Sequence, residues 1–520
     1  MPVLQSRVVR ARTVMMAWAL LASAGVAQRA GAQELNPEVQ RILSTAKLDK
    51  AKVGVSVIDV SSGRTMVSIA GNTPLVPASN MKILTAGAAA WALGPDFIFT
   101  TTLAMDGDKL IVTGSGDPSL VDPEMLTEAQ PRRTVADVIS LLGSSVQRGG
   151  VQAVSEIVVD DRVFDREYVH PSWPTDQLNR WYCAQVSGVN FHCNVLAVYT
   201  RPGSDGPGGA PTYTLQPAMP WISVENRART VKEQKNSVWL TRPADRNAFT
   251  LFGEVGMPVQ QPVEVTLHEP AMVFGQVLAS SIVGTGVTVG GSTEREGALR
   301  AVRLAGAEEK FTTATPLAII KTPIGDVLRR CNADSQNLYA EALFKRVGHQ
   351  VTKEPGSFAN AAAVMRMMIS ERLGPEAAAG TTIADGSGMS RLNQVAPSTL
   401  TKWMAALLND SKTRDAFLAS MPKPGEGTLR SRFDERKTRP FRSDIRGKSG
   451  AINGVRCLSG VVTSADGRTR YAYSVMVNDV QGDEIRAAMD FHENVVRALD
   501  RHLSGRSSDR RPERESAQGG

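Results

Sequence analysis

The N-terminal part of the chain carries apolar residues at the spacings of short helices and strands. Asn36-Pro37 combines an N-cap residue with a first-turn proline and predicts a helix to about residue 46. Residues 53–60 alternate and are rich in valine, and residues 66–69 return after a Ser-Ser-Gly turn, which predicts a hairpin. A second helix is predicted over 79–93, because Gly94-Pro95 then supplies a helix stop.

Helical periodicity returns in the C-terminal part. The elements predicted there are helices over 323–330, 338–347 and 357–373, strands over 458–463 and 471–477, and a last amphipathic helix over 483–503. Between the two ends, short apolar runs are separated by turns rich in glycine, proline and aspartate. This middle region is therefore expected to be strand-rich.

The simplest architecture is one discontinuous α/β domain built from both ends of the chain, residues 33–97 and 310–503. Residues 98–309 would form a large strand-rich insertion of one or more domains. Residues 504–520 lack apolar content and are expected to be a disordered tail. No internal repeat is evident.

The first residues indicate where the protein goes. Three arginines within residues 7–12 precede an apolar run at 14–21, and Ala30-Gly31-Ala32 has the small-x-small pattern of a signal-peptidase site. We expect a signal peptide over residues 1–32, with cleavage after Ala27 as the second possibility and a buried N-terminal helix as the alternative. The run is too short to span a bilayer. The prediction is an exported protein of a bacterial periplasm or cell surface without a stable membrane anchor.

Charge and composition exclude several classes of function. The net charge is +7, and loss of the leader removes four arginines, so only a mild positive excess remains and nucleic-acid binding is not expected. The six histidines are scattered and no C-x-x-C pattern occurs, so neither a metal site nor another cofactor is expected. Among four cysteines, Cys183 and Cys193 are close enough in sequence for a local disulfide, while Cys331 and Cys457 could pair or be free and buried.

Three short motifs, far apart in sequence, share one chemistry: Ser79-Asn80-Met81-Lys82, Ser335-Gln336-Asn337 and Lys448-Ser449-Gly450. A serine and a lysine three apart at a helix start lie on one face, and a serine becomes a good nucleophile only beside a base. Lys82 can be that base if burial or a second cation lowers its pKa. The first motif alone is weak evidence, because such a quartet also arises by chance.

The second and third motifs each allow a purely structural interpretation. Ser335 could relay a proton and Asn337 could hold the lysine, but either residue could instead be a helix N-cap. Lys448 and Ser449 could bind a carboxylate, with Gly450 leaving room for a substrate strand, although a lone lysine there is more often a solvated edge-strand residue. The occurrence of all three motifs in this order, in an exported chain, favours a serine acyl-transferase that works without histidine.

This order resembles that of penicillin-binding proteins and serine β-lactamases. Further segments resemble one branch, the D-alanyl-D-alanine carboxypeptidase/endopeptidases of the penicillin-binding protein 4 type. These segments are Gly114–Pro118, Ser335–Glu341, Asp385–Arg391, Pro424–Leu429 and Tyr473–Asn478. The long interval between the first two motifs also resembles this branch, in which an insertion separates them. The resemblance implies a penicillin-binding/serine β-lactamase-like transpeptidase domain with a large strand-rich insertion.

The resemblance also implies roles for the site residues. Ser79 would attack the carbonyl between two D-alanines with Lys82 as base, and Ser335 would pass the proton to the departing D-alanine. Asn337 would position these groups, Lys448 and Ser449 would meet the terminal carboxylate, and the backbone N–H groups of Ser79 and Ala451 would form the oxyanion hole. The implied partners are peptidoglycan peptides, with β-lactam antibiotics as covalent inhibitors; a homo-oligomer is possible.

The chain departs from the family pattern in the third motif. Ser449 stands where threonine is usual, which keeps the hydroxyl, whereas Ala451 and Asn453 stand where hydroxyl residues often help to hold the carboxylate. Carboxypeptidase and endopeptidase activity therefore both remain open. The alternatives are a serine β-lactamase and a non-catalytic peptidoglycan-binding protein of the same fold. A Ser-His-Asp hydrolase is disfavoured because no G-x-S-x-G elbow is present.

Overall fold

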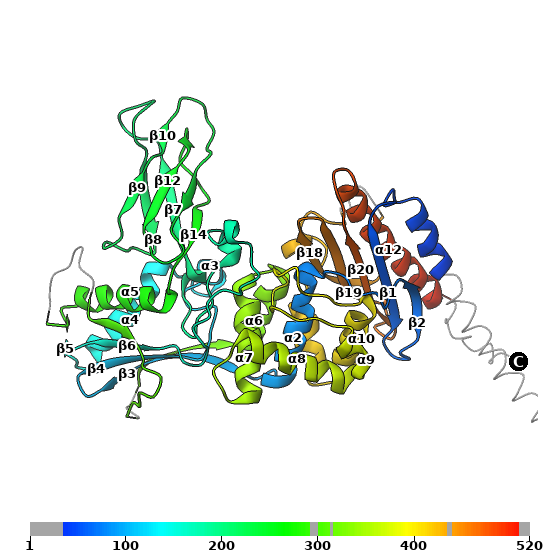
Figure 1. The fold of residues 1–520 in the computed structure, drawn as a ribbon, viewed down its shortest axis with the longest axis horizontal. Coiled ribbons are helices and arrows are strands. Elements are labelled where there is room, and N and C mark those ends of the chain that lie inside the picture. Colours follow the sequence, from blue (N-terminus) through cyan, green and yellow to red (C-terminus); the bar gives the residue numbers. More distant parts are fainter. Residues whose placement is uncertain (1–34, 292–299, 313–315, 434–438, 509–520) are drawn as a thin grey trace, which may run out of the picture. The chain divides into compact units, whose positions relative to one another are not determined.

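The structure, a computed structural model, describes residues 35–291, 300–312, 316–433 and 439–508 (Figure 1). The predicted signal peptide and most of the predicted tail lie outside these residues. The described chain divides into two compact units, and each is described by itself. Unit 1 comprises residues up to Asn80, Gln394–Asn409 and residues from Met421 on; unit 2 comprises Met81–Asn393 and Asp410–Ser420.

Unit 1 is built on a five-stranded antiparallel sheet in the order β18-β19-β20-β1-β2. The strands are β1 (Lys52–Asp59), β2 (Thr65–Ile69), β18 (Asp444–Ile452), β19 (Val455–Thr463) and β20 (Arg470–Asn478). The other elements are a helix over residues 35–44, η1 (Ala78–Asn80), α10 (Pro397–Asn409), η5 (Gly427–Leu429) and α12 (Glu484–Ser508). The predicted hairpin over 53–69 is confirmed as β1 and β2.

The two faces of this sheet differ in chemistry because side chains alternate along each strand. On one face, Val55 and Val57 of β1 and Val475 of β20 pack with the apolar side of α12 and the 35–44 helix. On the other face, Ser56 bonds to Thr401 of α10. This second face holds a buried row of serines that includes Ser459 and Ser474.

Unit 2 contains helices and several small sheets. Its helices are α2 (Met81–Leu93), α3 (Pro123–Glu128), α4 (Val135–Arg148), α5 (Pro270–Gly284), α6 (Ile324–Ala333), α7 (Asn337–Thr352), α8 (Phe358–Leu373), α9 (Pro375–Ala379) and α11 (Arg414–Ser420), with short turns η2 (Thr175–Gln177), η3 (Trp181–Cys183) and η4 (His192–Asn194). Helices α2, α6, α7, α8 and α11 pack together. Helices α4 and α5 were not predicted: the middle region is strand-rich but also helical.

The largest sheet of unit 2 is mixed, in the order β16-β6-β4-β3-β17. Its strands are β3 (Ile98–Asp106), β4 (Lys109–Gly114), β6 (Ile157–Asp160), β16 (Val302–Leu304) and β17 (Pro316–Pro323). The smaller sheets are formed by β5 (Ala153–Val154) with β15 (Thr288–Val289), by β7 (Val195–Arg201), β8 (Thr212–Gln216) and β14 (Val263–Thr266), by β9 (Val224–Asn226), β11 (Trp239–Thr241) and β12 (Phe249–Phe252), and by β10 (Arg229–Thr230) with β13 (Glu254–Val255).

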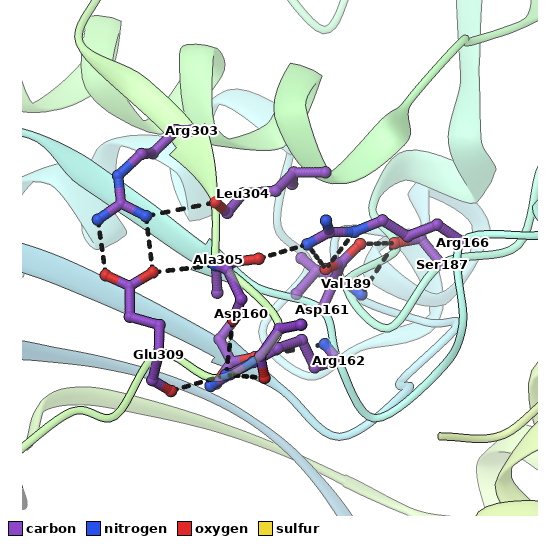
Figure 2. Close-up of polar contacts among 12 residues, drawn as sticks. Asp160, Asp161, Arg162, Arg166, Ser187, Val189, Arg303, Leu304, Ala305 and Glu309 are labelled. Carbon is purple, nitrogen blue, oxygen red and sulfur yellow. Dashed lines mark hydrogen bonds and ion pairs between the residues drawn. The ribbon is translucent and has the colours of Figure 1, made fainter. Parts of the chain in front are cut away.

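Arginine–carboxylate contacts fix the end of β6 to the segment after β16, as Figure 2 shows. Arg303 binds Glu309 through two N–H groups, each 2.7 Å from a carboxylate oxygen. Arg162 binds Asp160 and the Glu309 carbonyl, and Arg166 bridges Asp161 and the Ala305 carbonyl. These contacts hold the segment that follows β6 against the segment that follows β16.

Two sequence-based expectations are corrected here. Cys183 and Cys193 are not bonded: Cys183 packs with Trp173 and Met389, whereas Cys193 lines a separate cavity of about 550 Å³. The predicted tail begins too early, because α12 continues to Ser508. In the part of the chain that the structure describes, no helix is both long and apolar enough to cross a membrane.

A buried ion-pair network anchors α6 and α7 to α3. Arg330 of α6 is 2% exposed and binds Asp122, which is 1% exposed, at 2.9 Å; it also binds Glu124 and Asp334. Tyr339 of α7 donates to the same Asp122 carboxylate. Burial alone would raise the pKa of Asp122, but Arg330 and these hydrogen bonds hold it below its usual value.

We predict that Arg330→Met lowers the free energy of unfolding by about 3–5 kcal/mol, because it leaves the Asp122 carboxylate buried without its cation. Arg329→Met is the matched control, since Arg329 pairs with Glu128 at the surface; its loss is expected to change stability by less than about 1 kcal/mol. Urea unfolding of both variants measures this, and equal shifts in the two would contradict the prediction.

Candidate active site

Ser79 lies in η1, directly before α2, on a backbone that the unit 1 sheet holds in place. The next residue, Asn80, is fully buried, and its amide nitrogen donates to Ser459 Oγ at 2.6 Å. Ser459 is bonded in turn to Ser474 Oγ at 2.8 Å. This chain of hydrogen bonds fixes the peptide beside the serine to β19 and β20.

Gly450 of β18 packs directly on the Ser79 backbone. A Cβ atom at position 450 would stand 2.9 Å from the Pro77 carbonyl oxygen and 3.0 Å from the Ser79 nitrogen. Both neighbours are backbone atoms, so they cannot move aside as a flexible side chain could. Glycine is therefore required for β18 to approach the Ser79 amide this closely.

The third motif lies on the edge strand β18, but its lysine is not solvated. Lys448 is 0% exposed, and its register partner in β19 is Ser459, the residue that holds Asn80. Lys448 Nζ donates to the Ser449 carbonyl at 2.6 Å. The interpretation of Lys448 as a solvated edge-strand residue is wrong. Unit 1 thus brings together Ser79 and the strand that carries Lys448, Ser449, Gly450 and Ala451.

Lys82 lies in the first turn of α2 and is completely buried in unit 2. Its Nζ donates to Asn337 Oδ1 at 2.7 Å and to the Ser387 carbonyl at 2.9 Å. Burial lowers the pKa of Lys82 to about 8, while Cys331, Glu341 and Asp385 act in the opposite direction. A lysine with this pKa can lose its proton near neutral pH.

The second motif occupies the junction of α6 and α7. Ser335 has a left-handed backbone (φ 60°), and Gln336 is the N-cap of α7 without a side-chain capping bond. Neither Ser335 nor Asn337 is therefore an N-cap. Asn337 opens α7, and its amide nitrogen donates to the Tyr182 carbonyl at 2.7 Å. This bond turns the amide oxygen of Asn337 toward Lys82.

Two buried carboxylates that act on Lys82, Glu341 and Asp385, were not among the candidate site residues of the sequence analysis. Glu341 lies one helical turn after Asn337, so a reader of the sequence could place it on the same face of the helix. Asp385 accepts hydrogen bonds from the Trp173 ring nitrogen, the Asn393 amide and two backbone N–H groups. Both residues stand in segments that carry the family resemblance, but no local pattern indicates that they meet.

The motif residues are divided between the two units. Ser79 and the Lys448–Ala451 segment belong to unit 1, whereas Lys82, Ser335 and Asn337 belong to unit 2. The chain itself links the two sets, because only Asn80 and Met81 separate Ser79 from Lys82. Among the residues that the structure describes, no group of three or more His, Cys, Asp or Glu could hold a metal ion.

Comparisons with known proteins agree on one family. The D-Ala-D-Ala carboxypeptidase 3 (S13) family matches residues 35–496. A D-alanyl-D-alanine carboxypeptidase of Actinomadura sp. (strain R39) is 28% identical over 90% of this chain and 86% of that protein. The D-alanyl-D-alanine carboxypeptidase DacB of Haemophilus influenzae is 23% identical over 88% of this chain and 92% of that protein.

A solved structure shares the fold over most of the chain. The crystal structure of penicillin binding protein 4 from Haemophilus influenzae superposes with a TM-score of 0.69 at 21% identity, covering 89% of this chain and 99% of that chain. At this identity the match establishes the fold. The fold class expected from the sequence, a penicillin-binding protein-like α/β domain with many additional strands, is confirmed.

We predict that Gly450→Ala slows acylation of the protein by a fluorescent penicillin by about 10²-fold, because the new methyl group must displace the Ser79 backbone. Gly325→Ala is the control, since a Cβ there meets nothing within 4 Å. The rate of labelling by fluorescent penicillin is measured for each purified variant and compared with that of the wild type. A Gly450→Ala protein that is labelled at the normal rate would show that the close approach does not control the serine.

Proposed function

Because the chain belongs to the D-Ala-D-Ala carboxypeptidase 3 (S13) family, we propose that it hydrolyses the bond between two D-alanines in peptidoglycan peptides through an acyl-enzyme on Ser79. The observation that carries this proposal is the buried Lys82, three residues after Ser79, with a lowered pKa and a fixed ammonium. A serine that forms an acyl-enzyme needs such a base within reach.

In the acylation step, Ser79 Oγ attacks the scissile carbonyl and its proton passes to Lys82. The C–N bond to the terminal D-alanine then breaks; the Ser335 hydroxyl gives its proton to the leaving amine and takes the proton that Lys82 received, so both groups return to their starting state. Asn337 supports this step because its amide, held by Tyr182, fixes the lysine side chain. In the second step, water hydrolyses the ester and releases the shortened peptide and free Ser79.

The oxyanion and the terminal carboxylate would be bound by the strand β18. The backbone N–H groups of Ser79 and Ala451 are the proposed oxyanion hole, which the close packing of Gly450 on Ser79 supports. Lys448 and Ser449 would bind the carboxylate of the terminal D-alanine. A β-lactam amide mimics the D-Ala-D-Ala bond, so the same serine would be acylated by penicillins.

A second proposed activity, the cleavage of D-alanyl cross-links between stem peptides, is compatible with Ala451. This residue offers no hydroxyl for a terminal carboxylate, so binding of that group would rest on Lys448 and Ser449. An endopeptidase substrate has a different structure beyond the scissile bond, so its binding depends less on contacts to a terminal carboxylate. We infer that the enzyme works in the periplasm, because both proposed substrates belong to peptidoglycan and the signal peptide predicted over residues 1–32 would export the chain.

Ser79→Ala should abolish labelling by fluorescent penicillin, because the ester oxygen is removed. Lys82→Ala should slow labelling by about 10²–10⁴-fold, the usual contribution of a general base. Circular dichroism of both variants controls for folding. Persistent labelling of Ser79→Ala would show that the nucleophile lies elsewhere, and normal labelling of Lys82→Ala would remove the lysine from its role.

Incubation of the protein with purified peptidoglycan should release D-alanine from pentapeptides, split cross-linked dimers, or both, and mass spectrometry of the muropeptides distinguishes these products. The Ser79→Ala protein is the control for contaminating hydrolases. Rapid steady-state hydrolysis of a chromogenic cephalosporin, with no change in the muropeptides, would instead identify a β-lactamase.

A further inference from the structure

Glu341 of α7 is a completely buried carboxylate that binds two successive backbone N–H groups of the 385–387 turn. Its Oε2 accepts the Gly386 N–H and its Oε1 accepts the Ser387 N–H, each at 2.8 Å. Two bonds from one rigid carboxylate to successive peptides fix the orientation of both peptides. These are the 385–386 and 386–387 peptides, so Glu341 fixes the N-terminal side of Ser387. The Ser387 carbonyl belongs to the next peptide, whose Gly388 N–H donates to Asp385 Oδ1 at 2.8 Å.

That carbonyl is an acceptor for Lys82. Ser387 O lies 2.9 Å from Lys82 Nζ, and the preceding carbonyl, that of Gly386, accepts from Thr85 Oγ1 at 2.7 Å. Lys82 and Thr85 are three apart on α2, so the turn contacts one face of that helix twice. Glu341 thus connects α7 to the base of the proposed reaction through the Gly386–Ser387 turn.

The turn is packed too tightly against α7 to change its course. A Cβ at position 386 would stand 2.5 Å from Phe344 Cβ and 2.8 Å from the Ala340 carbonyl oxygen. Ala340 and Phe344 flank Glu341 on the same helix. Close packing and the two Glu341 bonds therefore hold the Gly386–Ser387 segment, and the Gly388 N–H bond to Asp385 holds the adjoining peptide that carries Ser387 O.

The titratable groups that act on Lys82 include the Cys331 thiol on α6 and the carboxyl groups of Glu341 on α7 and Asp385 in the turn. Lys345, the next cation along α7, is occupied by Asp165 and the Glu167 carbonyl. Burial, and after it Asp385, raises the pKa of Glu341 to about 8, although the hydrogen bonds from Ser387 and Gly386 act in the opposite direction.

Resting on the acyl transfer proposed above, we propose that Glu341 is a positioning residue for Lys82: it holds the Gly386–Ser387 segment, whose last residue binds the lysine through its carbonyl, and it places a carboxyl group near the lysine nitrogen. The geometry fixes the direction of the lysine side chain, and the ionised form of Glu341 favours the protonated form of Lys82. Loss of the charge should therefore let Lys82 become neutral at a lower pH.

Glu341→Gln tests both the positioning of Lys82 and the effect of the Glu341 charge on its protonation. The amide keeps the shape but sets an NH₂ group against a backbone N–H and removes the charge. The maximal rate of acylation by fluorescent penicillin should fall by about 10–10²-fold through misplacement of the base. The rise of that rate with pH should also move to lower pH than in the wild type, because a nearby negative charge that favours Lys82 protonation is gone.

Glu341→Asp separates geometry from charge. The shorter side chain cannot span both N–H groups but keeps its charge, so the rate should fall while the pH dependence stays near that of the wild type. Asp117→Asn is the matched structural control: Asp117 is also buried and accepts the Ser119 N–H at 2.8 Å, and it is not among the groups that act on Lys82. Its loss should lower the melting temperature without moving the pH profile.

The outcomes are distinct. A Glu341→Gln protein with a lowered melting temperature and an unchanged pH profile would make Glu341 merely structural and overturn the proposal. If that variant does not fold, a Glu341→Asp protein with the full wild-type rate overturns it instead. If the wild type is not acylated, or Ser79→Ala still is, the failure belongs to the proposed function and not to Glu341.

Discussion

The structure depends most on the burial of one ammonium group. Lys82 is removed from water entirely, and a buried ammonium is stable only if hydrogen-bond acceptors replace its hydration. Asn337 Oδ1 and the Ser387 carbonyl are such acceptors, and both are neutral oxygens. Direct contact with a carboxylate would stabilise the charged form and raise the pKa. Burial outweighs the opposing effects of Cys331, Glu341 and Asp385 and lowers the pKa of Lys82 to about 8, while the two neutral oxygens hold its nitrogen in place.

This arrangement explains why residues between the first and second motifs contribute to the site. Asn337 is oriented by the Tyr182 carbonyl, Asp385 is held by the Trp173 ring nitrogen, and Lys345 of α7 is held by Asp165. All three partners come from residues 165–182, in the segment that the sequence marks as inserted. Within unit 2, this segment therefore fixes α7 and the 385–387 turn, the two elements that carry the acceptors of Lys82.

The sequence predicts those parts of the fold and site that local patterns encode. The alternation of 53–60 and the Gly94-Pro95 stop are local signals, and both elements are found. Helix α4 had a readable signal as well, since Thr134 and Asp137 form a capping box at its start. By contrast, the burial of Lys448, the bonds of Glu341 to residues 386 and 387, and the separation of Cys183 from Cys193 depend on contacts between distant segments. No propensity or spacing at these positions reports such contacts.

The first motif contains two residues, Asn80 and Lys82, that are held by different parts of the structure. Asn80, on one side of the Asn80–Met81 peptide, is bonded to the serines of β19 and β20, while Lys82, on the other side, is bonded to α7 and the 385–387 turn. A nucleophile on a free loop would need its base to find it in each catalytic cycle, and that search would slow the reaction. The hydrogen bonds of Asn80 in unit 1 and of Lys82 in unit 2 restrain the chain on each side of the Asn80–Met81 peptide. The spacing Ser-x-x-Lys is then more than a requirement for one helix face, because it leaves two residues between the proposed nucleophile and its base, and one of them is itself anchored.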